Sequence, residues 1–170
     1  MTTSLLRHCL VGGAALAIAV GLGASARAQG LMPTHRVSAS LANEAVGAAV
    51  EHCKSQGYAV SAVLVDTSGT RQAVLRGDNA GIHTIDSAGG KAYTSTSFKA
   101  PSGVVRERLM GNPAAAGLQF VPGILMVQGG VPIKVGEEVV GAIGVAGAPG
   151  GDKDEACAQA GIDKIKDRLK

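Results

Sequence analysis

The sequence predicts an α+β fold: a single α/β domain in which helices flank one antiparallel sheet. Apolar residues recur at helical spacing within residues 41–53, 85–98 and 156–169, whereas residues 58–76 and 123–146 hold β-rich runs. Short turns separate these runs, which is typical of antiparallel strands because parallel strands need long crossovers. The chain has 170 residues and a predicted leader takes 28, so the 142 that remain are close to the usual size of one domain.

The first 28 residues have the pattern of a cleavable signal peptide. Arg7 precedes an uncharged apolar run at residues 9–23, and small residues follow as far as Ala28. Signal peptidase recognises this order of regions, and the run is too short to span a bilayer of about 30 Å comfortably. An uncleaved membrane anchor is the alternative. We expect cleavage after Ala28, a periplasmic or secreted protein, and no transmembrane segment in the mature chain.

The mature chain is expected to be almost neutral. The whole chain has 16 Lys and Arg against 13 Asp and Glu, a net charge of +3, and the leader removes Arg7 and Arg27. The remaining basic residues form no cluster of the kind that binds a phosphate backbone. We therefore expect no nucleic-acid partner.

An arm, a helix and a hairpin are predicted in the first half of the mature chain. Residues 29–39 contain Gly and Pro without periodicity, which predicts a flexible arm before a domain at 40–170. Ser40 is the expected N-cap of a helix that ends at Gly57. Residues 58–65 and 70–76 then predict two strands, because the residues between them are typical of a turn.

Helices and a three-stranded meander are predicted in the second half. A glycine-rich segment at residues 77–81 precedes a helix that Thr84 is expected to cap. Asp152 and Glu155 are interpreted as the cap of the last helix, with a bound cation as the alternative. The other expected elements are a short helix at 103–110 and strands at 123–128, 131–135 and 139–146, which bring the sheet to five strands.

Two cysteines remain once Cys9 has left with the leader. Cys53 and Cys157 lie on predicted helices at opposite ends of the domain. In an oxidising compartment they are candidates for a disulfide, which requires the two helices to pack with Cα atoms within about 7 Å. Two buried thiols are the alternative.

The sequence holds few groups with obvious chemistry. It contains no nucleophile elbow, phosphate-binding loop, dinucleotide fingerprint or H-E-x-x-H metal motif. His35 and His52 have no partner at metal-ligand spacing and are interpreted as surface residues. His83 differs because it lies at a helix N-terminus, where the helix dipole favours a neutral imidazole that can bind iron. A structural role at the start of the helix is the alternative.

The mature domain resembles the GlcG/HbpS family, also called haem-degrading-domain proteins, over roughly residues 41–169. Each motif is weak alone, but their order and spacing together are specific. The segments that carry the resemblance are 59–69 (AVSAVLVDTSG), 75–80 (LRGDNA), 87–94 (SAGGKAYT), 129–133 (GGVPI), 140–147 (VGAIGVAG) and 154–161 (DEACAQAG).

This resemblance implies a profilin-like five-stranded antiparallel sheet, homo-oligomers up to octamers, haem as cofactor and, for some members, a membrane sensor protein as partner. Our leading hypothesis is a non-catalytic haem-binding or haem- and redox-sensing protein. His83 is the expected iron ligand, Tyr93 or Met126 a weaker donor, and Lys91 or Arg106 the partner of the haem propionates. The alternative is an enzyme or binding protein for a small organic acid such as a hydroxy acid, handled by the 77–83 loop and Lys91.

Overall fold

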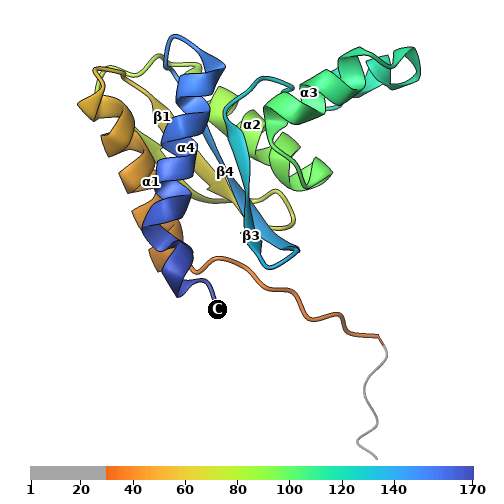
Figure 1. Cartoon of the computed structure of the whole chain (residues 1–170), viewed down its shortest axis with the longest axis horizontal. Helices are drawn as coiled ribbons and strands as arrows, with labels where there is room; N and C mark the ends of the chain where they lie inside the picture. The colour runs from red at the N-terminus through yellow and green to blue at the C-terminus, as the bar shows by residue number, and fades with distance from the viewer. Residues whose placement is uncertain (1–29) are drawn as a thin grey trace, which may run out of the picture. The chain divides into compact units, whose positions relative to one another are not determined.

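Four α-helices, four strands and two short 3-10 helices form the part of the chain that this computed structural model describes, residues 30–170 (Figure 1). The predicted signal peptide lies outside these residues. No helix within them is long and apolar enough to cross a membrane. The elements, in chain order, are α1 (Ala39–Ser55), β1 (Ser61–Val65), β2 (Arg71–Arg76), α2 (Thr84–Phe98), α3 (Ser102–Met110), η1 (Pro113–Phe120), β3 (Gly130–Val135), β4 (Glu138–Ala146), α4 (Gly151–Ile165) and η2 (Lys166–Arg168).

The sheet is antiparallel throughout and has the order β2-β1-β4-β3. Helices cover both of its faces: α1 and α4 lie side by side on one face and α2 lies on the other (Figure 1). Strand β1 is central, and all five of its residues are buried. Its side chains alternate between the two layers, since Leu64 packs with the α1 and α4 layer while Val63 and Val65 pack beneath α2.

The predicted fifth strand at residues 123–128 is wrong, because this segment is a loop. Gly123 has a φ of +87°, which a regular strand does not adopt. The Leu125 amide donates to Thr94 Oγ1 at 2.8 Å, and the Ser102 hydroxyl donates to the Val127 carbonyl at 2.7 Å. Helix side chains thus satisfy backbone groups that a strand would pair in a ladder.

Helix α1 packs against the sheet through residues spaced three and four apart. Its N-cap is Ser38, two residues before the predicted cap, and the Ser38 hydroxyl accepts a hydrogen bond from the Leu41 amide at 3.4 Å. Within the expected arm, Val37 is only 2% exposed and its carbonyl accepts a hydrogen bond from Gln72. The end of that segment therefore lies against the domain.

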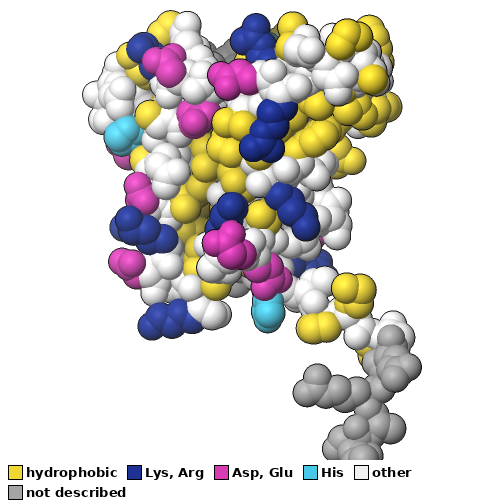
Figure 2. Space-filling model, turned by 45° about the vertical axis from the view of Figure 1, so that its right-hand side comes forward, with side chains coloured by type: hydrophobic (Ala, Val, Ile, Leu, Met, Phe, Trp, Pro, Cys, Tyr) yellow, Lys and Arg dark blue, Asp and Glu magenta, His cyan; other side chains and the backbone are white. Residues whose placement is uncertain are grey.

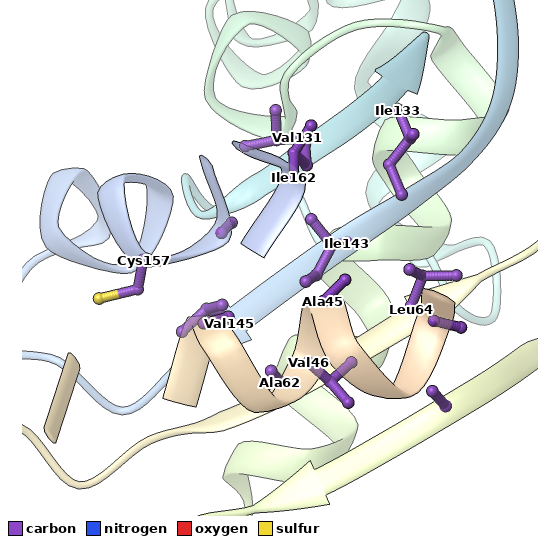
Figure 3. Packing of buried hydrophobic residues seen from close by; sticks show 14 of the residues in the cluster. Ala45, Val46, Ala62, Leu64, Val131, Ile133, Ile143, Val145, Cys157 and Ile162 are labelled. Carbon is purple, nitrogen blue, oxygen red and sulfur yellow. The ribbon is translucent and has the colours of Figure 1, made fainter. Parts of the chain in front are cut away.

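The α1 and α4 layer holds the larger hydrophobic cluster (Figure 3). A disulfide joins Cys53 of α1 to Cys157 of α4, with their Cα atoms 5.6 Å apart. Gly161 of α4 allows close packing, because a Cβ there would lie 2.6 Å from the Ala45 carbonyl oxygen of α1. The two terminal helices are therefore in contact along their backbones and joined covalently.

Candidate functional site

Helix α2 positions most of the predicted site residues, and its two faces meet different surroundings. Its inner face packs on β4 with almost no intervening side chain. A Cβ on Gly144 of β4 would lie 2.1 Å from the Ala88 carbonyl oxygen, so only glycine permits this approach. Ala88 and Ala92 are both fully buried there. The position of α2 is thus set by backbone contact with the sheet.

A buried ion pair also belongs to the inner face. The Lys91 ammonium donates to Asp154 Oδ2 at 2.7 Å and to the Val145 carbonyl at 2.9 Å. The Ala148 amide donates to Asp154 Oδ1 at 3.0 Å. Both charged side chains are 5% exposed. The pair therefore links α2, the end of β4 and the first turn of α4.

The environment of Asp154 changes its acidity. Burial raises the pKa of the Asp154 carboxyl above its ordinary value of 3.8, because desolvation disfavours the charged form. The hydrogen bond and the charge of Lys91 oppose this rise. Helix α4 has Gly150 as its N-cap, with no side-chain capping hydrogen bond, so the cap predicted at Asp152 and Glu155 is not formed.

The placement of Lys91 corrects two expectations. Its ammonium is inside the domain with protein partners, so it does not face a ligand carboxylate. Asp78 of the 77–83 loop is exposed, whereas Lys91 is buried and paired with Asp154. A small acid held by this loop would therefore be held without Lys91.

The outer face of α2 borders an open groove of about 370 Å³ between the β1–β2 turn and the loop after η1. Tyr93 lies within it between two glycines with positive φ, Gly69 and Gly123. A Cβ on Gly69 would come within 2.6 Å of the Tyr93 ring, and one on Gly123 within 3.3 Å. Glycine at both positions thus makes room for the ring. The groove is lined by Val65, Gly69, Arg71, Asp86, Gly89, Gly90, Tyr93, Gly123, Ile124 and Leu125.

Arg71 and Asp86 are the charged residues of this groove, and sequence reasoning missed both. Arg71 Nη2 donates to Asp86 Oδ1 at 2.8 Å, and the side chains are 43% and 84% exposed. A signal for Asp86 was available, since residues 83, 86, 90 and 93 share one face of a helix. Arg71 gave no such signal, because only the hairpin places it beside α2.

His83 lies at the N-terminal end of the same outer face. It is the N-cap residue of α2 and is exposed, and its side chain makes no capping hydrogen bond. The ring lies close to Gly81, where a Cβ would be 2.9 Å from His83 Cε1. The predicted cap, Thr84, is instead the first residue of the helix. The Thr84 hydroxyl lies 2.7 Å from the Ser61 hydroxyl and donates a hydrogen bond to the Gly81 carbonyl.

The remaining predicted donors lie elsewhere. Tyr93 is ten positions after His83 along α2, or about 15 Å along the axis, so one iron can take only one of them. Arg106 is exposed on α3, in a separate hollow of about 240 Å³. Met126 lines a further hollow beside η1. Among residues 30–170, no three His, Cys, Asp or Glu side chains are grouped to hold a metal ion.

Comparison with known proteins establishes the family. The sequence profile described as "Haem degrading protein HbpS-like" matches residues 37–163, which is most of the chain. This chain belongs to the HbpS-like family. Two HbpS crystal structures agree in fold and sequence. One is 39% identical over 82% of this chain and 96% of the other, with a TM-score of 0.76. The other, a Streptomyces reticuli HbpS with two Glu-to-Asp substitutions, is 37% identical over 90% and 97%, with a TM-score of 0.75.

A more distant structure shares the fold alone. A PduOC:heme complex is 23% identical over 76% of this HbpS-like chain and 95% of the other, with a TM-score of 0.70. No curated protein matches the chain. The family profile and the two HbpS structures thus confirm the family and the α+β fold. In this chain the sheet has four strands.

Proposed function

We propose that this protein is exported and binds haem, as a non-catalytic haem-binding or haem- and redox-sensing protein of the periplasm or the extracellular space. The observation that carries the proposal is the outer face of α2. It offers an imidazole at His83, where the helix begins, and an open groove lined by the Tyr93 phenol and the Arg71 guanidinium. Family membership supports this assignment, and so does the haem bound by the related PduOC.

The residues present fit a haem held against an open surface. Two adjacent glycines, Gly89 and Gly90, and the side chains of Ile124 and Leu125 line the groove, which suits a flat apolar ring. His83 is the proposed iron ligand and Tyr93 the alternative, since haem proteins use both side-chain types. The iron would supply a reversible redox change, and the protein would bind and orient the ring.

We also propose that the protein forms homo-oligomers, up to octamers, and that a membrane sensor protein receives its signal. Support for self-association comes from the projection formed by α3, η1 and the loop that follows (Figure 1). None of the η1 residues is buried. Hydrophobic side chains gather on this projection (Figure 2, upper right), and large exposed apolar surfaces commonly mark interfaces. Its most exposed large hydrophobic residues are Met110, Phe120, Val121 and Val127.

A haemin titration tests the proposal for haem. Purified protein is titrated with haemin and followed at the Soret band, with His83→Ala, Tyr93→Phe and His52→Ala compared with the wild type. His52 is an exposed histidine on α1, on the opposite side of the sheet, and serves as the matched control. We expect saturable binding by the wild type and by His52→Ala, and weaker binding with a shifted Soret band for His83→Ala.

The variants separate the two donors. A shift in Tyr93→Phe with none in His83→Ala would assign the iron to Tyr93. Weak, unsaturable changes that are equal in all four proteins would indicate adventitious haem and contradict the proposed function.

Sedimentation of wild type and Phe120→Asp tests the oligomer, because a charge on the projection should lower the mass of the oligomer if that surface is the interface.

A further inference from the structure

Arg71 is held in an unusual way at the edge of the groove. It is the first residue of β2, and its guanidinium lies against the backbone of α2 at Gly89. A Cβ on Gly89 would be 2.8 Å from Nη2, 2.9 Å from Nε and 3.0 Å from Cζ of Arg71. All three guanidinium atoms lie within 3.0 Å of that position, so the group packs closely against the helix backbone at Gly89. Glycine at position 89 is what leaves it this room.

Only a small part of the hydrogen-bonding capacity of Arg71 is used. A guanidinium has five N–H donors, and within residues 30–170 only Nη2 makes a hydrogen bond, to one oxygen of Asp86. The pair is open to water, and exposed pairs contribute little because water and salt screen them. Asp86 thus orients the guanidinium, and another carboxylate can replace it at low cost.

We infer that Arg71 is the carboxylate anchor of the groove, exchanging Asp86 for a propionate of the bound haem. This inference rests on the proposed haem binding and names the residue that recognises the acidic edge of the ligand. Arg71 lines the same groove as Tyr93, whereas Arg106 borders another hollow and Lys91 is paired inside the domain. The unused N–H donors of Arg71 would allow a bidentate contact to a propionate in place of the single charge-assisted hydrogen bond to Asp86.

Arg76, at the other end of β2, provides a matched control. It is an exposed arginine on the same edge strand, but its Nε and Nη2 donate to the Ala80 carbonyl and it borders a different hollow. Its substitution removes the same charge from the same strand without changing the groove. Any effect of net charge on haem binding should therefore appear equally in both arginine variants.

The test compares haemin with haemin dimethyl ester, in which both propionates are capped. We expect Arg71→Gln to weaken haemin binding about tenfold, the typical effect of losing a hydrogen bond to a charged group. The dimethyl ester should bind wild type and Arg71→Gln equally. Asp86→Asn should tighten haemin binding about two- to fivefold, because the competing carboxylate is gone. Arg76→Gln should match the wild type with both ligands.

The outcomes distinguish this inference from the proposal on which it rests. Saturable haemin binding that Arg71→Gln leaves unchanged would overturn the anchor and leave haem binding standing. An equal loss for haemin and its ester would also overturn it, since Arg71 would then act on the shape of the groove. Failure of the wild type to bind haemin would overturn both. An unchanged Soret maximum in haem-loaded Arg71→Gln would agree with a role away from the iron.

Discussion

Two ion pairs of nearly equal length lie on opposite faces of α2. Lys91 and Asp154 are 2.7 Å apart on the inner face, and Arg71 and Asp86 are 2.8 Å apart on the outer face. Their burial is opposite, since the inner side chains are 5% exposed and the outer ones 43% and 84%. The contact distance is therefore a poor guide to what each pair does.

Burial decides the role of each pair. Removing one partner of a buried pair leaves an uncompensated charge in a medium of low dielectric, so Lys91 and Asp154 hold the fold in one arrangement. The outer pair exchanges easily with water or with a ligand carboxylate. One helix can thus be fixed on its inner face and remain adaptable on its outer face.

The largest effect is expected from breaking the inner pair. Lys91→Met should lower the free energy of unfolding by about 3–5 kcal/mol, because Asp154 is left buried without its cation. Urea denaturation followed by circular dichroism measures the change. Arg71→Met, the matched change on the outer face, should cost less than about 1 kcal/mol.

A double variant checks the cause. Lys91→Met combined with Asp154→Leu removes both charges, and it should recover much of the loss because no unpaired charge remains. A double variant that is less stable than Lys91→Met alone would show that packing around Asp154, and not its charge, dominates.

The next effect concerns the close approach of α2 to the sheet. Gly144→Ala should lower the free energy of unfolding by about 3 kcal/mol, since the new Cβ would lie 2.1 Å from the Ala88 carbonyl oxygen and backbone must move. Thermal unfolding monitored by circular dichroism tests this expectation. Stability equal to the wild type would mean that α2 can shift on the sheet without cost.

The sequence predicted the helices and the hairpin better than the contacts between segments that are distant in the chain. The hairpin and the terminal helices depend on local periodicity and turn residues, and they form where that pattern indicated. The loop at residues 123–128 has an apolar composition typical of a strand. Its backbone instead bonds to Thr94 and Ser102, which are distant in sequence. A local pattern cannot include such partners.

The site was predicted only in part for the same reason. Helical spacing places Lys91 and Tyr93 on opposite faces of α2, but it does not say which face the sheet covers. That depends on Asp154, which is 63 residues further along the chain. The place of Arg71 in the groove could not be predicted from the sequence, because it depends on the hairpin that places β2 beside Gly89.

A pH dependence of the inner pair follows from the raised pKa of Asp154. A carboxyl whose pKa is higher in the folded than in the unfolded state binds its proton more tightly when folded. Its contribution to stability is therefore greatest at low pH and falls as pH rises above about 3.8 through the folded pKa. The difference in unfolding free energy between wild type and Asp154→Asn should show this slope.

Glu44 gives the control of opposite sign. The hydrogen bond from Arg168 lowers the pKa of the Glu44 carboxyl below its ordinary value of 4.5. Its contribution should therefore be present above pH 4.5 and be lost as pH falls. Urea titrations of Glu44→Gln and Asp154→Asn between about pH 3 and 7 measure both slopes. Parallel slopes would contradict the assignment of Asp154.

The smallest expected effect is a gain in stability on the outer face of α2, whereas the substitutions that disturb the inner face should lower stability. Gly89→Ala should raise the free energy of unfolding by about 0.5–1 kcal/mol, because alanine favours a helix and the three atoms nearest to its Cβ belong to the movable end of Arg71. The same change should weaken haemin binding, since the guanidinium loses its place on the helix. Gly90→Ala, one residue further along, is the control. Its new Cβ would lie 2.8 Å from Leu125 Cβ, so this variant should gain less stability than Gly89→Ala. A large loss of stability in Gly89→Ala would mean that Arg71 is fixed, and the outer face would then be as rigid as the inner one.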